Sequence, residues 1–410
     1  MRAGTVPAVL GGLGVGAVAG AYRPMLRRWP LSMIGALPSA FASETPALVA
    51  GVQAVAAASA LRGEGWRRAA GVGLNAAALA GLAGLAGDAR RSGRALSEAL
   101  AQTGLLPPGE LPARRPAGVL QGHLARRRYR RVADISYSEH GPYGTLDVWH
   151  RADLPSTGRA PVLLQVHGGA WTMGDKLNQA EPLLGYLAER GWVCVTVNYR
   201  LAPAHRWPAM VVDVKRAIAW IREYISGHGG DPDFVAVTGG SAGGHLAALA
   251  ALSANDPDYQ PGFTEIDTTL RAAVPLYGVH DFTEDHQGLF ALLEGKIMES
   301  TMEVDPRTWR QASPALRVGP EAPPFLIVHG STDAIVGVRQ SRLLAAALRE
   351  RSPAPVGYAE LPHAQHGFDG LPTARTAYTV DAVHRFLAAV HRDYRSGAGE
   401  TGRNRATAAR

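Results

Sequence analysis

From about residue 132 onward, short apolar runs alternate with segments of helical periodicity. The runs at 161–166, 192–197 and 234–237 are rich in Val, Leu and aromatic residues, which is typical of buried strands. Between two of them, apolar side chains recur at helical spacing, at Val211, Val214, Ile218, Ile221 and Ile225. Alternating strands and helices predict an α/β fold whose mostly parallel central sheet is covered by helices on both faces.

The pattern divides the chain into four parts. We expect an apolar, arginine-flanked N-terminal helical region at 1–94, a proline- and arginine-rich linker at 95–131, an α/β domain at 132–395 and a flexible tail at 396–410. Within the α/β domain, residues 281–316 are too long for a simple connection, so we expect them to form part of a lid.

The N-terminal region contains three uncharged stretches, at 3–22, 45–61 and 69–87, each flanked by arginines. Their lengths approach the roughly 20 residues needed to cross a bilayer, although Ala and Gly dominate their composition. Three interpretations stay open: membrane spans or a membrane-lying hairpin, a soluble cap over an active site, and a cleaved signal sequence for the first stretch. We favour a membrane tether that is separable from a soluble domain beginning near Ala117.

Charge is divided unevenly along the chain. Residues 1–131 hold 17 arginines, no lysine and 5 acidic residues, whereas the remainder holds 25 basic and 30 acidic residues. This division argues against a nucleic-acid surface on the α/β domain and indicates either membrane headgroups or another anionic partner for the N-terminal part. The basic cluster at 125–131 is either a solvated charge run or a second lipid contact. The single cysteine, Cys194, lies in an apolar run and is expected to be buried.

A glycine-flanked serine is the strongest chemical signal in the sequence. The stretch TGGSAGGH at 238–245 places Ser241 between a predicted strand and a predicted helix. This context fits a nucleophile elbow, in which a serine projects from a tight strand-to-helix turn. We expect Ser241 to be a catalytic nucleophile.

A serine nucleophile requires a base and a carboxylate, and both follow in the sequence. Asp333 comes after the apolar run at 323–330, and His366 stands in the stretch LPHAQHGFD. We assign Asp333 and His366 to a catalytic triad with Ser241, and keep His363 as the rival base. His245, just after the serine, is interpreted as a packed structural histidine.

The apolar run at 161–166 leads into the stretch HGGAW, which supplies candidate oxyanion donors. We assign the backbone N–H groups of Gly168 and Gly169, together with that of Ala242, to the oxyanion hole. The aromatic and imidazole candidates for an acyl pocket are Trp171, Trp207, His280 and Phe282.

Five separated motifs occur in one order: HGGAW, NYRLAPAHRWPA, GGSAGGHLA, HGSTDAIV and HGF. Together they resemble the hormone-sensitive-lipase-like family of bacterial esterases and, within it, the mycobacterial Lip-type carboxylesterases. The resemblance extends from about residue 132 to about 392. It implies an α/β-hydrolase fold, hydrolysis of carboxylic esters without cofactor or metal, and Ser241, Asp333 and His366 as the triad.

The chain departs from the family pattern at two positions, because Gly240 and Ala204 stand where the family usually has acidic residues. The stretch HGGAW followed by GDK also resembles formamidases and prenylcysteine methylesterases, which provides the alternative function. We expect a serine carboxylesterase or lipase acting on small-molecule or lipid esters at the membrane of a bacterial cell envelope, with a cytoplasmic location as the alternative. The sequence predicts no oligomeric state.

Overall fold

The structure is a computed structural model. It describes residues 5–107, 109, 111, 129–177, 179–285 and 287–408, the last of these without side chains from 398 onward. Most of the predicted proline-rich linker and the start of the basic cluster at 125–131 lie outside the described residues.

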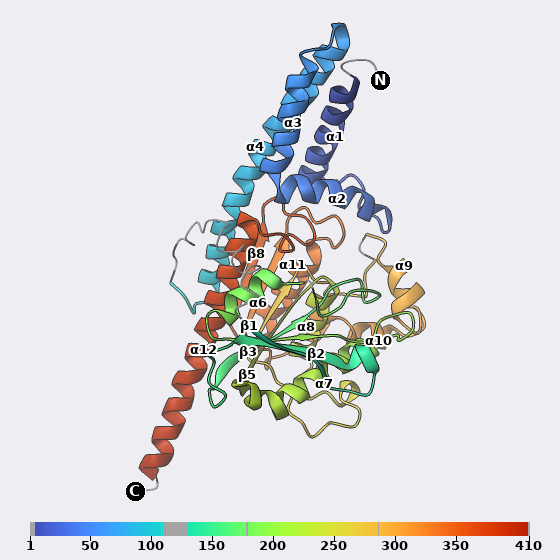
Figure 1. Cartoon of the computed structure of the whole chain (residues 1–410). Coiled ribbons are helices and arrows are strands. Elements are labelled where there is room, and N and C mark those ends of the chain that lie inside the picture. The colour runs from blue at the N-terminus through green and yellow to red at the C-terminus, as the bar shows by residue number, and fades with distance from the viewer. Residues whose placement is uncertain are drawn as a thin grey trace.

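One eight-stranded sheet forms the centre of the molecule, in the order β1-β2-β4-β3-β5-β6-β7-β8 (Figure 1). β1 and β2 are antiparallel to their neighbours, and from β4 to β8 all pairs are parallel. The mostly parallel sheet expected from the sequence is therefore present. The strands are β1 Tyr129–Ser136, β2 Thr145–Arg151, β3 Ala160–Val166, β4 Val193–Val197, β5 Gly230–Gly240, β6 Ala272–Leu276, β7 Phe325–Gly330 and β8 Val356–Leu361.

Helices cover both faces of the sheet because successive strand side chains point to opposite sides and both sets are apolar. One core contains side chains of α7, α8 and α11, and the other contains side chains of α4, α6 and α12. Cys194 is buried in the second core. The helices of the α/β domain are α6 Glu181–Ala188, α7 Ala209–Tyr224, α8 Ala242–Leu252, α9 Phe290–Leu292, α10 Pro306–Gln311, α11 Arg339–Arg351 and α12 Ala374–Ala408. Short 3-10 or π turns occur at Gly141–Gly144, Ile225–His228, Pro257–Tyr259, Leu293–Ile297 and Pro314–Leu316.

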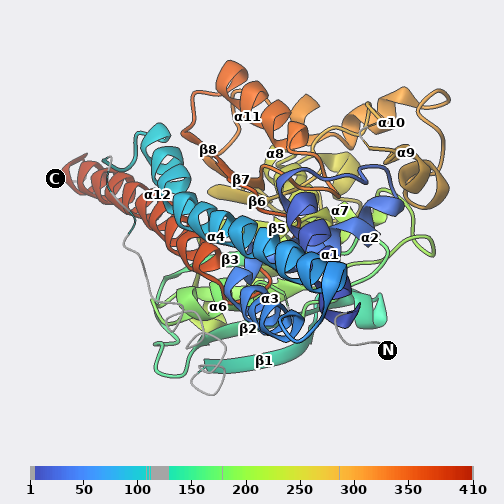
Figure 2. The same ribbon diagram turned by 90° about the horizontal axis from the view of Figure 1, so that it is seen from above.

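The N-terminal region forms four helices: α1 Thr5–Tyr22, α2 Leu31–Glu44, α3 Pro46–Ala60 and α4 Gly65–Gln102. α1, α3 and the first half of α4 pack side by side and project away from the sheet, while α2 lies across their base (Figures 1 and 2). Two of these helices, α1 and α4, are long and apolar enough to cross a membrane. Only 33% and 28% of the residues in their most apolar windows are buried, so most of this apolar surface faces outward.

Polar side chains lie between these apolar helices. The Asn75 side-chain amide donates to the carbonyls of Pro7 (2.9 Å) and Gly71 (2.7 Å), and that of Gln53 donates to Leu10 (3.3 Å). The bond to Gly71 lies within α4, whereas those to Pro7 and Leu10 join different helices. Side-chain hydrogen bonds between helices, with apolar side chains outside, are a known feature of helix bundles in membranes.

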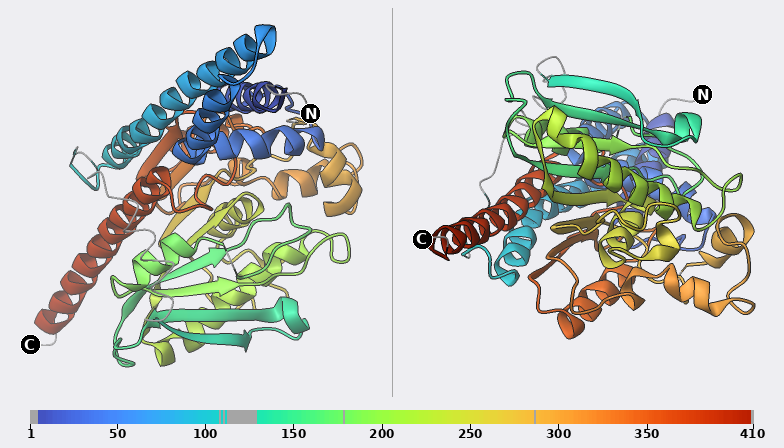
Figure 3. Two further views of the ribbon diagram at one scale, coloured as in Figure 1. Left: turned by 45° about the horizontal axis from the view of Figure 1, so that its top comes forward. Right: turned by 90° about the horizontal axis from the view of Figure 1, so that it is seen from below.

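The second half of α4 belongs to the α/β domain, which differs from the separable tether expected from the sequence. α4 continues past residue 94 to Gln102, and Leu96, Ala99 and Leu100 are buried in the core that α12 and the sheet share. α4 and α12 lie side by side in Figure 3 and contact each other. The apolar pattern ends at 87, but a helix continues wherever tertiary packing favours it, and here the sheet supplies that packing. The backbone of α12 likewise runs through the segment expected as a tail, as far as Ala408.

Candidate active site

Ser241 stands on a strained turn between β5 and α8. Its backbone has φ 57° and ψ −121°, a conformation that L-residues rarely adopt. The flanking glycines make this turn possible: a Cβ on Gly239 would lie 2.5 Å from the carbonyl of Gly243, and one on Gly243 would lie 2.1 Å from the carbonyl of Val166. The strand, turn and helix of a nucleophile elbow are therefore present at Ser241.

Asp333 and His366 meet at the same edge of the sheet. Asp333 follows β7 and His366 follows β8, and His366 Nδ1 lies 2.7 Å from Asp333 Oδ2. His363, the rival base, points instead toward the N-terminal region, where its Nδ1 lies 2.8 Å from Oδ2 of Asp88 on α4.

The surroundings of Asp333 keep its carboxylate ionised. Its Oδ1 accepts the backbone N–H groups of Ile335 (2.8 Å) and Val336 (2.9 Å), and His329 Nε2 lies 3.3 Å from Oδ2. Burial raises the pKa of Asp333. The charge on His366 and the hydrogen bonds from His329 and His366 lower it by more than burial raises it, so the pKa of Asp333 lies well below its usual range. A buried carboxylate of this kind fixes the orientation of the imidazole beside it.

The loop after β3 passes directly beside Ser241. A Cβ on Gly168 would lie 2.7 Å from the carbonyl of Gly240 and 3.4 Å from Cβ of Ser241. The N–H of Gly168 donates to the side-chain oxygen of Gln179 at 2.7 Å. The N–H groups of Gly169 and Ala242 have no such partner among the described residues. Of the three predicted oxyanion donors, Gly168 is therefore already engaged.

A cavity of about 490 Å³ joins these groups, and Ser241 and His366 both line it. Its size is typical of a small-molecule site. Lid residues Leu292 and Lys296 contribute one part of the wall, and Trp29 and Met33 from the N-terminal region contribute another. The sequence did not predict this contribution of Trp29 and Met33, because nothing in the apolar pattern of residues 1–94 relates it to the serine.

The four side chains predicted for the acyl pocket do not line this cavity. Trp171, Trp207, His280 and Phe282 are all at most 5% exposed and belong to a buried cluster around His245. The loop after β3 reverses at Ala170 and Trp171, both with positive φ, and the indole of Trp171 lies 5.4 Å from the ring of Phe282, centroid to centroid. These rings pack against one another, so their faces are not available to a ligand in the cavity.

His245 is a packed, neutral histidine, as the sequence predicts. Its Nδ1 accepts the indole N–H of Trp171 (3.2 Å), and its Nε2 lies 2.8 Å from the carbonyl of Ala312. Complete burial lowers the pKa of His245 to about 4, so its ring is uncharged at neutral pH.

Gly240 leaves room for a tyrosine hydroxyl. A Cβ at position 240 would lie 2.5 Å from the hydroxyl of Tyr277, and this hydroxyl donates to Asp369. The Tyr277 ring also contacts His366, with 4.8 Å between centroids. A carboxyl group thus lines the cavity even though the position before the serine is not acidic. Sequence reasoning missed this pair, although Tyr277 directly follows β6 and Asp369 ends the stretch LPHAQHGFD.

The N-terminal region holds the loop that carries His366. Besides the Asp88–His363 contact, the hydroxyl of Ser43 on α2 donates to the carbonyl of His363 at 2.6 Å, and the Gln365 amide donates to the carbonyl of Ala21 at 3.3 Å. Fully buried Arg375 forms an ion pair with Glu44 of α2.

Arg375 connects α2, α4 and the histidine loop. It donates to the carbonyl of Pro362 (3.0 Å) and to the hydroxyl of Ser92 on α4 (3.2 Å). These contacts fix the start of the histidine loop against two N-terminal helices, and the sequence alone gave no signal that would pair residues so far apart.

Comparisons with known proteins identify the α/β domain. Residues 146–348 match the family model BD-FAE. The probable carboxylic ester hydrolase LipM of Mycobacterium tuberculosis is 49% identical over 295 residues, which cover 71% of this chain and 68% of that protein. Esterase LipC of the same organism is 44% identical, covering 74% and 78% respectively.

A solved structure agrees with these relatives. The apo form of Thermogutta terrifontis esterase 2 matches with a TM-score of 0.54 at 25% identity, covering 63% of this chain and 94% of that one. The fold is that of the α/β-hydrolases, and the formamidase or prenylcysteine methylesterase alternative is not favoured. This protein is a carboxylic ester hydrolase and belongs to the family of bacterial Lip-type carboxylesterases.

Proposed function

We propose that this esterase cleaves its substrate through an acyl-enzyme on Ser241. His366 takes the proton from the Ser241 hydroxyl as the oxygen attacks the ester carbonyl, and Asp333 holds the imidazole in the required tautomer. The tetrahedral intermediate then collapses, the ester C–O bond breaks, and His366 gives its proton to the departing alcohol, which leaves the acyl group on Ser241. Water attacks the acyl-enzyme while His366 takes a proton from it, and the carboxylic acid leaves as His366 returns that proton to the Ser241 oxygen. The observation that carries this assignment is the 2.7 Å contact of His366 with Asp333 at a cavity that Ser241 also lines.

The oxyanion that forms in each step is received by the N–H groups of Gly169 and Ala242. Both lie beside the nucleophile and have no hydrogen-bond partner among the described residues. The N–H of Gly168 can join them only when its hydrogen bond to the Gln179 side chain breaks. In the resting enzyme, this hydrogen bond holds the loop after β3 in place.

Substitution of the nucleophile tests the triad. Ser241→Ala should lower ester turnover by about 10⁴-fold or more and abolish labelling by a fluorophosphonate, without a change in circular dichroism. The exposed Ser226, substituted by Ala, is the matched control and should retain full activity. Near-normal turnover by a contaminant-free Ser241→Ala preparation would refute the assignment.

The enzyme works at a membrane, in which α1, α3 and the first half of α4 are embedded, and its substrates include lipid esters. Arg68 and Arg90 near the two ends of the apolar part of α4 are exposed. At a rise of about 1.5 Å per residue they are about 33 Å apart, which matches the ~30 Å hydrocarbon core of a bilayer. Arg23, Arg27 and Arg28 are exposed at the same base as Arg90, where lipid headgroups would lie.

Fractionation tests the membrane association. The full-length enzyme should sediment with vesicles, resist extraction by high salt, and need detergent for release, because apolar burial dominates the attachment. A full-length enzyme that stays in the supernatant without detergent and without vesicles would contradict it.

A further inference from the structure

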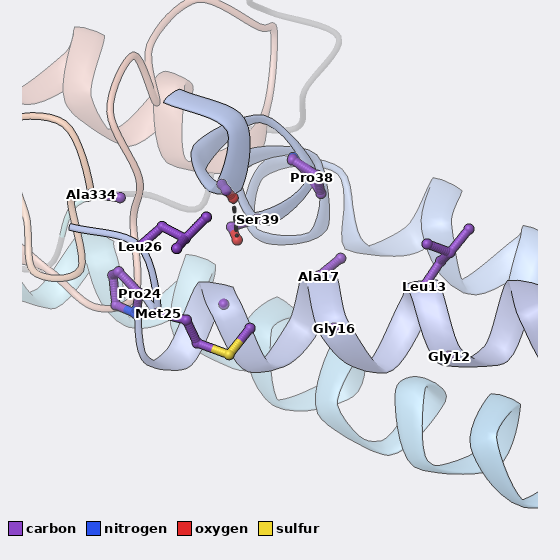
Figure 4. A pocket seen from close by; sticks show the side chains of 12 residues that line it. Gly12, Leu13, Gly16, Ala17, Pro24, Met25, Leu26, Pro38, Ser39 and Ala334 are labelled. Atoms are coloured by element: carbon purple, nitrogen blue, oxygen red, sulfur yellow. Dashed lines mark hydrogen bonds between the residues drawn. The ribbon is translucent and has the colours of Figure 1, made fainter. Parts of the chain in front are cut away.

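A second cavity lies between the N-terminal helices, outside the active site. It has a volume of about 240 Å³ and opens between α1 and α2. Figure 4 shows the side chains of Leu13, Ala17, Met25, Leu26 and Pro38 around this space. We call this cavity the α1–α2 groove; its lining is Gly12, Leu13, Gly16, Ala17, Gly20, Pro24, Met25, Leu26, Gly35, Pro38, Ser39 and Ala334.

The lining presents almost nothing that could hold a polar ligand. Ser39 carries the only polar side chain in it, and its hydroxyl donates to the carbonyl of Gly35 at 2.9 Å. Two glycines, Gly12 and Gly16, form the α1 side of the groove, and no heavy atom lies within 4 Å of a Cβ built on either. Other glycines of α1 serve helix packing instead, since a Cβ on Gly11 would lie 2.7 Å from Leu74.

The groove lies between the exposed apolar surface of the bundle and the segments that line the active-site cavity. On the outer side, Leu13 and Met25 are 66% and 73% exposed. On the inner side, the groove ends at Ala334, which directly follows Asp333, and the next residue, Ile335, lines the active-site cavity. Met33 on α2 also lines that cavity, two residues before Gly35 of the groove.

The base of the groove combines this apolar space with positive charge. Arg23, Arg27 and Arg28 lie in the segment between α1 and α2, and all three are exposed. A ligand with a hydrocarbon chain and an anionic or polar head would place its chain in the groove and its head at these arginines.

We propose that the α1–α2 groove binds a hydrocarbon chain of the lipid ester that the enzyme hydrolyses, so that the lipid moves sideways from the membrane toward Ser241. This proposal rests on the proposed function at Ser241 and on the membrane position of α1. The N-terminal helices would then take part in substrate selection, because the hydrocarbon chain of the substrate contacts them while its ester group lies in the active-site cavity.

Filling the groove tests the proposal through chain-length preference. Gly16→Leu places a side chain in the groove without a clash at Cβ, and helix propensity favours Leu over Gly. Each displaced methylene lowers binding roughly fourfold. We expect kcat/KM for p-nitrophenyl palmitate to fall about tenfold or more, while kcat/KM for p-nitrophenyl butyrate stays within about twofold of wild type.

Gly73→Leu is the matched control, because Gly73 is an exposed glycine of α4 with open space at Cβ and does not line the groove. It should leave both esters unaffected. If Gly16→Leu lowers turnover of both esters equally, or of neither, the groove does not bind the chain.

A binding measurement separates this proposal from the catalytic one. In detergent, Ser241→Ala protein should be crosslinked by a palmitate analogue with a diazirine near its chain end, at residues of the groove, and Gly16→Leu in the same background should remove these crosslinks. Crosslinks confined to the active-site cavity, or unchanged by Gly16→Leu, would overturn the groove assignment. Inactivity of wild type toward all esters would refute the proposed function alone, since crosslinking does not depend on turnover.

Discussion

The N-terminal helices and the α/β domain distribute their apolar side chains in opposite ways. Among the described residues, fifteen of the twenty exposed large hydrophobic side chains lie between Val6 and Trp66, whereas the sheet strands β3 to β7 are almost wholly buried. The same helices bury Gln53 and Asn75 between them. Water excludes apolar groups from the surface of the α/β domain. In the membrane position that we propose for the bundle, lipid would accept the apolar groups on its surface.

The two regions meet at a polar interface. The base of the bundle contributes Asp88, Ser43 and Glu44, and the α/β domain contributes His363 and Arg375. A flexible tether would need no such contacts. These contacts indicate that the bundle positions the loop that carries His366, in addition to the membrane attachment that we propose for it.

The largest expected effect distinguishes the two histidines of that loop. His366→Ala should lower kcat/KM for esters by about 10⁴-fold, because the base beside Asp333 is lost. His363→Ala should retain most of the activity, since its imidazole faces Asp88. Steady-state kinetics of both variants distinguish the two histidines. A larger loss in His363→Ala than in His366→Ala would identify His363, beside Asp88, as the catalytic base.

Removing the N-terminal helices should destabilise the α/β domain. A chain beginning near Ala117 lacks Leu96, Ala99 and Leu100, and so exposes the core that they share with α12. We expect this truncated chain to aggregate, and size-exclusion chromatography would detect it. A monomeric, active truncated enzyme would show instead that α4 is dispensable for the sheet.

Loss of the Glu44–Arg375 ion pair should destabilise the interface between the N-terminal helices and the α/β domain. Glu44→Ala leaves the buried guanidinium of Arg375 without its carboxylate, which costs about 3–5 kcal/mol of unfolding free energy. Denaturant titration in detergent measures this cost. Glu64→Ala, at an exposed residue before α4, is the control and should change the unfolding free energy by less than about 0.5 kcal/mol.

The smallest expected effect concerns the contact of Asp88 with His363. Asp88→Asn should lower kcat about threefold to tenfold and leave KM for butyrate esters nearly unchanged, because the loop with His366 becomes less well positioned while the cavity stays intact. Asp88 also pairs with exposed Arg91 at 2.8 Å, so Arg91→Ala is the control for that second contact. If Arg91→Ala and Asp88→Asn lower kcat equally, the effect of Asp88 comes from its contact with Arg91 on α4 and not from its contact with His363.

The sequence predicts the centre of the active site better than its walls. Ser241 and Asp333 each follow a predicted strand, and parallel strands bring their carboxyl ends to one edge of the sheet, so their proximity can be expected from the sequence. His366 follows β8, which the apolar pattern did not predict, and it was assigned from the stretch LPHAQHGFD. Trp171 and Phe282 carry no such information. Whether an aromatic ring lines a cavity or packs on another ring depends on loop conformation, which apolar patterning does not encode.

Contacts across the interface were beyond prediction for a different reason. Asp88 and His363 are 275 positions apart; Asp88 alone resembles an ordinary helix-surface residue, and His363 drew attention only as the rival base. The second half of α4 shows the same limit, since its burial depends on α12, whose position is known only once the sheet is in place. Gln179 was also missed, because its partner is a backbone N–H that any side-chain acceptor could bind.

The Arg375–Glu44 pair joins residues 331 positions apart and sets an order of events during synthesis of the protein. The ribosome releases α1 to α4 first and the loop that carries His366 almost last, so Glu44 lacks Arg375 and Asp88 lacks His363 while most of the chain is still being translated. A lipid bilayer would stabilise the early helices during that interval. The predicted triad is completed only when the late segment that carries His366 docks on these helices, so the nascent chain holds no complete triad before that segment has been translated.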